Sequence, residues 1–107
     1  MSLRFVRVAR TSEIGEKRSK LVHLEDEEIC VWRVDGMLYA INNVCPHQHL
    51  PALHQGTLDG NKVTCPMHGW TFSLETGAAQ FGNGRLKTYR VRVEGENVLV
   101  EKPVDSW

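Results

Sequence analysis

The 107-residue sequence lacks the features that mark several large classes of protein. It has no apolar run approaching the roughly 18 residues that a membrane span needs. Its three cysteines are too few for the disulfide framework of a small secreted domain. The first ten residues alternate apolar and basic side chains, with neither the apolar core of a secretory signal nor a twin-arginine segment. These absences predict a soluble, cytoplasmic protein whose thiols stay reduced.

The sequence also lacks an excess of positive or negative charge. Thirteen Lys and Arg balance thirteen Asp and Glu, whereas proteins that bind nucleic acid usually carry a basic excess. We therefore expect neither nucleic acid nor a membrane among the partners. The one uneven stretch is Glu25-Asp26-Glu27-Glu28. It fits a solvated turn between strands, or a docking patch for a basic partner protein.

Helical periodicity does not extend beyond a turn or two, and short runs of β-branched and aromatic residues alternate with Gly, Asp and Asn. This pattern favours an all-β fold in one domain, an antiparallel sandwich or a partly open barrel. Asp35-Gly36 predicts a type I′ hairpin, Cys30 is expected in the core, and residues 56–60 are expected to form loop and turn. The predicted strands are 3–8, 20–24, 29–34, 37–41, 62–65, 70–74, 87–93 and 98–101.

Two short arms carry the residues with chemical potential. The first reads Cys45-Pro46-His47, and after seventeen further residues the second reads Cys65-Pro66-Met67-His68. Each arm offers one thiolate and one imidazole. A proline after each cysteine fixes φ and stiffens the turn, and Gly69 permits a close backbone approach. The spacing therefore predicts a metal site with four protein ligands.

The spacing leaves alternatives open. Free cysteines often behave as small buried hydrophobes, so the arms would then hold no metal. A structural zinc site of the Cys₂His₂ type is the stronger competitor. Zinc sites more often place their cysteine pair and their histidine pair on separate stretches, whereas here each arm mixes the two.

Cys-x-His followed by Cys-x-x-His at this separation resembles the Rieske iron–sulfur family. The resemblance implies one [2Fe–2S] cluster, with Cys45 and Cys65 on one iron and His47 and His68 on the other. It also implies a base formed by residues 1–43 and 84–107 and a cluster-binding subdomain formed by residues 44–83. Its spacing leaves His49 outside the ligand set, and His54 is expected to be solvent-exposed, with a place at the rim of the cluster as the alternative to no role.

The resemblance also assigns the surroundings of the cluster and its potential. Pro46, Leu50, Met67, Gly69, Trp70 and Phe72 would surround it. Quinol-oxidising members of the family carry a disulfide at the positions of Leu50 and Met67, and hydroxyl donors at those of Trp70 and Phe72. Without those donors we expect a midpoint at the bottom of the Rieske range of about −150 to +300 mV.

With these departures the chain resembles the Rieske-type ferredoxins rather than the quinol-oxidising members of the family. Such a ferredoxin is not an enzyme, because a chain of 107 residues has no room for a catalytic iron domain as well. It would pass single electrons from a flavin reductase to a terminal oxygenase such as a ring-hydroxylating dioxygenase. One alternative is the small subunit of an NADH-dependent nitrite reductase. Another, of a different class, is a redox-sensing or zinc-stabilised interaction module.

Overall fold

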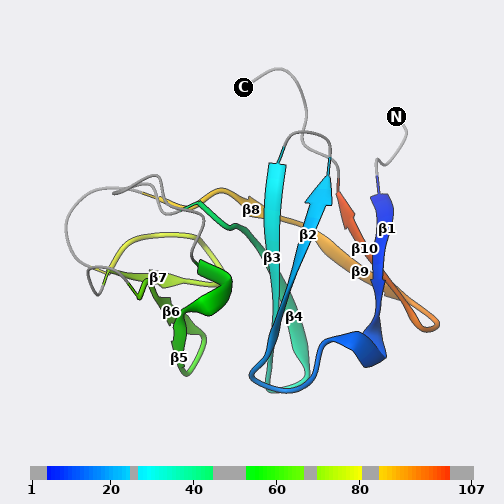
Figure 1. The fold of residues 1–107 in the computed structure, drawn as a ribbon, viewed down its shortest axis with the longest axis horizontal. Coiled ribbons are helices and arrows are strands. Elements are labelled where there is room, and N and C mark those ends of the chain that lie inside the picture. The colour runs from blue at the N-terminus through cyan, green and yellow to red at the C-terminus, as the bar shows by residue number, and fades with distance from the viewer. Residues whose placement is uncertain (1–4, 25–26, 45–52, 67–69, 81–84, 102–107) are drawn as a thin grey trace.

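A computed structural model of the chain describes residues 5–24, 27–44, 53–66, 70–80 and 85–101. Figure 1 draws the remaining residues as a thin grey trace. The strands are β1 (Phe5–Arg10), β2 (Ser19–Leu24), β3 (Glu27–Val34), β4 (Met37–Asn42), β5 (Thr57–Asp59), β6 (Lys62–Thr64), β7 (Thr71–Ser73), β8 (Thr88–Tyr89), β9 (Val91–Glu94) and β10 (Asn97–Glu101). Two 3₁₀ turns accompany them, η1 (Thr11–Glu13) and η2 (Leu53–Gln55).

The strands form three antiparallel sheets, in the orders β1-β10-β9, β2-β3-β4-β8 and β5-β6-β7. The four-stranded sheet lies between the other two (Figure 1). The predicted antiparallel all-β fold is therefore confirmed, and the described strands form open sheets that do not close into a barrel. In the described part of the chain no helix has the length and apolar character to cross a bilayer.

The central sheet is buried on both faces, which explains the unbroken apolar run in β3. Ile29 and Val31 pack into a core shared with β1 and β10. Cys30 and Trp32 point the other way, because successive side chains of a strand alternate, and join a core shared with the β5-β6-β7 sheet. The prediction that Cys30 is a core residue is confirmed, since it is fully buried. Burial raises the pKa of its thiol to about 12.

The β3–β4 hairpin turns at Asp35 and Gly36, as predicted. Both have positive φ, 52° and 80° respectively, as a type I′ turn requires. The Glu16 carboxylate caps this turn by accepting the backbone N–H groups of Asp35 and, at 3.0 Å, of Gly36. These two hydrogen bonds lower the pKa of Glu16.

Two predictions near other turns are wrong. Residues 87–93 were expected to form one strand, but the chain leaves the central sheet after β8 and enters the outer sheet as β9. Strict alternation is the same on either sheet, so it cannot reveal this change. Residues 56–60 were expected as loop and turn, yet Thr57–Asp59 forms β5 and pairs with β6. Only Gly60, with a φ of 63°, lies in the turn itself.

The acidic run also departs from expectation. Glu25 and Asp26 lie outside the described residues. Glu27 and Glu28 begin strand β3 rather than forming a solvated turn. Both are half-buried, and their side chains contact the end of β4.

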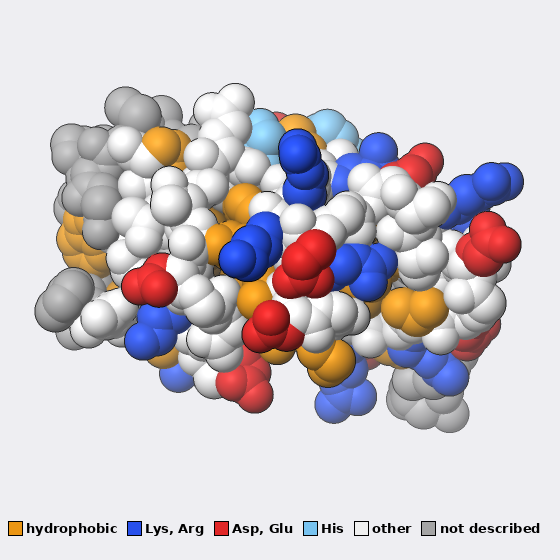
Figure 2. Space-filling model, turned by 90° about the horizontal axis from the view of Figure 1, so that it is seen from below, with side chains coloured by type: hydrophobic (Ala, Val, Ile, Leu, Met, Phe, Trp, Pro, Cys, Tyr) orange, Lys and Arg blue, Asp and Glu red, His pale blue; other side chains and the backbone are white. Residues whose placement is uncertain are grey.

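The surface carries interspersed charges. On the face shown in Figure 2, basic and acidic side chains alternate, with apolar side chains between them. Met37 and Val93 are the large apolar side chains that stand most exposed among the described residues.

Candidate functional site

The structure describes only part of the predicted ligand set. Cys65 lies among the described residues, and it is 1% exposed at the end of β6. Trp70, Phe72 and His54 are described as well. The convergence of the four predicted ligands stays a prediction, because these residues lie outside the described ranges: Cys45, Pro46, His47, His49, Leu50, Met67, His68 and Gly69.

The first arm is held at both ends by the side chains that follow β4. The Val44 N–H donates to Asn42 Oδ1 at 2.9 Å. On the far side, the Leu53 N–H donates to the Asn43 backbone oxygen at 3.2 Å, and the His54 N–H donates to Asn43 Oδ1 at 2.7 Å. The described residues on either side of 45–52, Val44 and Leu53, are therefore both held beside the end of β4.

The second arm is closed by a hairpin. Strands β6 and β7 pair antiparallel up to Thr64 and Thr71, whose hydroxyl oxygens lie 2.9 Å apart and share a hydrogen bond. The Cys65 N–H then donates to the Trp70 backbone oxygen at 2.7 Å. Residues 66–69, with His68 among them, form the connection beyond this bond. Cys65 is buried while Pro66 is exposed, so the cysteine marks the boundary between core and surface.

The closed ends of the two arms pack against each other. Leu53 and Cys65 belong to one buried apolar cluster, together with Val63 and Phe72. Gly56 makes the close approach possible: a Cβ there would lie 2.6 Å from the Thr64 backbone oxygen and 2.8 Å from Val63 Cγ2. Any larger residue at position 56 would push the arms apart.

Trp70 and Phe72 form the apolar wall next to Cys65. Their rings stack with centroids 6.4 Å apart and an angle of 26° between the planes. Phe72 is fully buried and Trp70 is half-buried. Neither carries a hydroxyl group, as the sequence requires, so no O–H donor comes from these two positions.

The expectation that His54 is solvent-exposed is wrong. It is half-buried in η2, and its ring Nδ1 lies 3.1 Å from Asn43 Oδ1. Its backbone oxygen accepts the Ser19 hydroxyl at 2.8 Å. These contacts give His54 a structural role in closing the first arm.

The sequence reasoning missed Asn42 and Asn43. Asn43 is fully buried and is the one polar side chain in the described core. Its side chain is hydrogen-bonded, as a buried polar group has to be. A signal was present, because tandem asparagines one residue before a cysteine arm are suited to accept backbone N–H groups from the following turn.

Comparison with known proteins settles the family. The family model of the Rieske [2Fe–2S] domain matches residues 4–90. This chain belongs to that family. It is 30% identical over 103 residues to the naphthalene 1,2-dioxygenase system ferredoxin component of Pseudomonas aeruginosa, covering 94% of this chain and 98% of that protein.

Solved Rieske structures agree. The ferredoxin of Sphingomonas yanoikuyae B1 superposes with a TM-score of 0.84 at 29% identity, covering 92% of this chain and 99% of the other. The putative NADH-dependent nitrite reductase small subunit of Mycobacterium tuberculosis gives a TM-score of 0.89 at 19% identity, over 97% of this chain and 99% of that chain. At that identity the second likeness shows the shared fold alone.

The cofactor of a Rieske domain is one [2Fe–2S] cluster, and the residues here fit it. Cys65 supplies a buried thiol directly after β6, where its backbone N–H is bonded to Trp70, and Leu53, the first described residue after the first arm, packs in the same core. Together with the predicted ligands Cys45, His47 and His68, Cys65 would give a donor set of two thiolates and two imidazoles, the combination that Rieske centres use. When bound, the cluster supplies one-electron redox chemistry.

Proposed function

We propose that this protein is a Rieske-type ferredoxin that carries single electrons to the terminal oxygenase of a ring-hydroxylating dioxygenase system. The observation that carries the proposal is the match to a dioxygenase ferredoxin component along nearly the full length of both chains. The protein is then a carrier and not itself a catalyst. A solved complex of reduced oxygenase and oxidized ferredoxin in carbazole 1,9a-dioxygenase supports this proposal. One chain of that complex superposes on this protein over its full length, with a TM-score of 0.85 at 27% identity.

We further propose that Cys45, His47, Cys65 and His68 ligate the cluster, within a subdomain of residues 44–83 on a base of residues 1–43 and 84–107. The sheet β5-β6-β7 lies wholly inside the proposed subdomain, and the strands of the other two sheets lie wholly outside it, which supports this division. The closed arms support the ligand set, because they bring the chain on both sides of each arm to one core.

The proposed donor is a flavin reductase, and both redox partners would dock transiently at the histidine edge of the cluster. An apolar rim of Pro46, Leu50, Met67 and Trp70 would meet them over a small interface, as is usual for redox encounters. The cytoplasm is the proposed compartment. A cluster held by two thiolates needs cysteines that stay out of disulfides, which suits a reducing compartment.

A redox titration tests the carrier role. An NADH-driven chain needs a low-potential carrier, so we expect a midpoint near the bottom of the Rieske interval of about −150 to +300 mV. A midpoint above about +100 mV, in the upper part of that interval, would contradict the proposal.

A reconstitution assay separates the leading function from the nitrite reductase alternative. The reductase and oxygenase components of naphthalene 1,2-dioxygenase, given NADH and this protein in place of their own ferredoxin, should oxidise naphthalene in proportion to added protein. Delivery of electrons to a nitrite reductase large subunit, with none to the oxygenase, would favour the alternative.

A further inference from the structure

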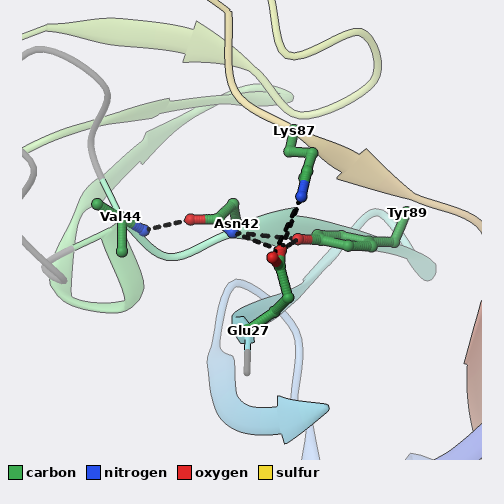
Figure 3. A network of polar contacts seen from close by, with 5 residues as sticks. All are labelled: Glu27, Asn42, Val44, Lys87 and Tyr89. Atoms are coloured by element: carbon green, nitrogen blue, oxygen red, sulfur yellow. Dashed lines mark hydrogen bonds and ion pairs between the residues drawn. The ribbon is translucent and has the colours of Figure 1, made fainter. Parts of the chain in front are cut away.

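The side-chain amide of Asn42 links the start of β3 to the residue that precedes the first arm. Glu27 Oε1 accepts the Asn42 side-chain N–H at 3.1 Å, and Asn42 Oδ1 accepts the Val44 N–H at 2.9 Å. Figure 3 shows this relay running from the carboxylate to the residue before Cys45. Asn42 thus connects β3 to the entry of the first arm.

Glu27 is itself fixed by the distant strand β8 and the residue before it. The Tyr89 hydroxyl donates to Glu27 Oε1, and Lys87 Nζ lies 3.1 and 3.2 Å from the two carboxylate oxygens. The Tyr89 hydrogen bond is the main reason that the pKa of Glu27 is lowered, so the group is an ionised acceptor at neutral pH. Because an ionised carboxylate only accepts hydrogen bonds, the Asn42 amide must turn its nitrogen toward Glu27 and its oxygen toward Val44.

Glu28 repeats the arrangement one residue along. Its Oε1 accepts the Asn43 side-chain N–H at 3.3 Å, and its backbone oxygen accepts the Asn43 N–H at 2.9 Å. Asn43 Oδ1 is thereby turned toward the far end of the arm, where it accepts the His54 N–H at 2.7 Å. Two neighbouring carboxylates therefore orient two neighbouring amides, and each amide holds one end of the same segment.

We propose that Glu27, Glu28, Asn42 and Asn43 form a carboxylate–amide clamp that positions the first ligand arm on the central sheet. This inference rests on the proposed ligand set, because the arm matters to the cluster through Cys45 and His47. Within the acidic run, Glu27 and Glu28 then act as positioning residues. Groups that orient metal ligands tune the metal site, and their loss typically costs about 10- to 100-fold in metal affinity.

The test compares Asn42→Leu with a matched control. The variant keeps the approximate size of the side chain but removes both hydrogen bonds of the relay. Glu16→Ala is the control, because Glu16 caps the opposite end of the same β3–β4 hairpin with its carboxylate. The measurements on each holoprotein are the midpoint potential, the EPR spectrum of the reduced state, the rate of cluster loss in a chelator, and the melting temperature.

We expect Asn42→Leu to lose its cluster about 10- to 100-fold faster than wild type and to show a shifted midpoint and altered EPR signals. Glu16→Ala should lower the melting temperature and leave the midpoint and EPR signals unchanged. Tyr89→Phe removes the hydroxyl that donates to Glu27 and accepts the Asn42 side-chain N–H at 3.1 Å. It leaves the Asn42 hydrogen bonds to Glu27 and Val44 in place, so it should give a smaller change of the same kind. It keeps the test valid if Asn42→Leu does not fold.

Three outcomes overturn the clamp. Wild-type midpoints and loss rates in both Asn42→Leu and Tyr89→Phe would show that the relay does not position the arm. Equal shifts in Glu16→Ala would show that general destabilisation is the cause. A wild-type protein without a nitrogen-ligated [2Fe–2S] signal would overturn the ligand set and the clamp together, whereas failure to reduce an oxygenase would leave the clamp's readouts unchanged and overturn only the proposed function.

Discussion

The two cysteine arms are nearly alike in sequence, yet the structure closes them by different means. The second arm closes on itself, because Cys65 and Trp70 are bonded through their backbones across a short hairpin end. The first arm belongs to a longer segment, residues 45–52, whose described neighbours Val44 and His54 are bonded to the side chains of Asn42 and Asn43. Closing a longer segment costs more chain entropy, so more of the fold is engaged in holding it.

This difference predicts where each arm is vulnerable. The second arm depends on local β-pairing, which most side-chain changes leave intact. The first arm depends on amides whose orientation is set by carboxylates and by β8. A substitution far from the cluster in sequence can therefore disturb the first arm and leave the second unaffected.

The largest expected effect comes from replacing a buried cysteine by alanine, with Cys65 and Cys30 substituted in separate variants. Cys65→Ala removes a proposed ligand, so the protein should lose the visible absorption and EPR signal of the cluster. Cys30→Ala is the control, because Cys30 is equally buried but lies in β3. It should keep both signals. A wild-type spectrum in Cys65→Ala would show that Cys65 is not a ligand of the cluster.

The next effect probes the contact between the arms. Gly56→Ala places a methyl group against the Thr64 backbone oxygen and should cost about 3 kcal/mol, the upper part of the range for overpacking. Gly60→Ala, in the β5–β6 turn, meets nothing within 4 Å and should cost only the strain of its positive φ, about 1 kcal/mol. Denaturant melts of both variants measure the difference, and equal losses would argue against close packing of the arms at Gly56.

A smaller effect sharpens the contrast between the arms. Thr71→Val removes the hydroxyl that bonds Thr64 and should cost about 1 kcal/mol. The backbone closure at Cys65 stays in place, so the midpoint should match wild type. A midpoint shift as large as that of Asn42→Leu would mean that side chains control the second arm as well.

The last effect appears only at alkaline pH, and it belongs to the core and not to the arms. Burial raises the pKa of Cys30 from 9.0 to about 12. Between these values the unfolded chain releases the thiol proton while the folded chain keeps it, so folding should weaken as the pH rises above 9. Denaturant melts of wild type and Cys30→Ala from pH 8 to pH 11 test this. Identical slopes in the two proteins would assign the dependence to other groups.

Much of the fold was predictable from local pattern. Asp35-Gly36 specified a hairpin because its turn geometry favours few other residues, and the apolar run around Cys30 matched a strand buried on two faces. The break between β8 and β9 was not predictable, because alternation has the same period on both sheets. The roles of Glu27 and Glu28 were hidden for another reason: they depend on Asn42, Asn43 and Tyr89, and Tyr89 lies 62 residues from Glu27.

The sequence predicts the residue types and spacing of the candidate ligands, and their convergence stays a prediction, because three of the four lie outside the described residues. The supports of the site were not predictable. Gly56 gives no sign in the sequence that it faces the Thr64 backbone, and His54 shows no sign of being held by Asn43. Such contacts arise from packing between segments, which local pattern does not record.

Pulsed EPR of the dithionite-reduced protein tests the central claim most directly. The account predicts a [2Fe–2S] signal with hyperfine coupling to the nitrogens of two imidazoles, those of His47 and His68. A cluster signal without nitrogen coupling, or a protein that binds zinc and gives no signal, would contradict it.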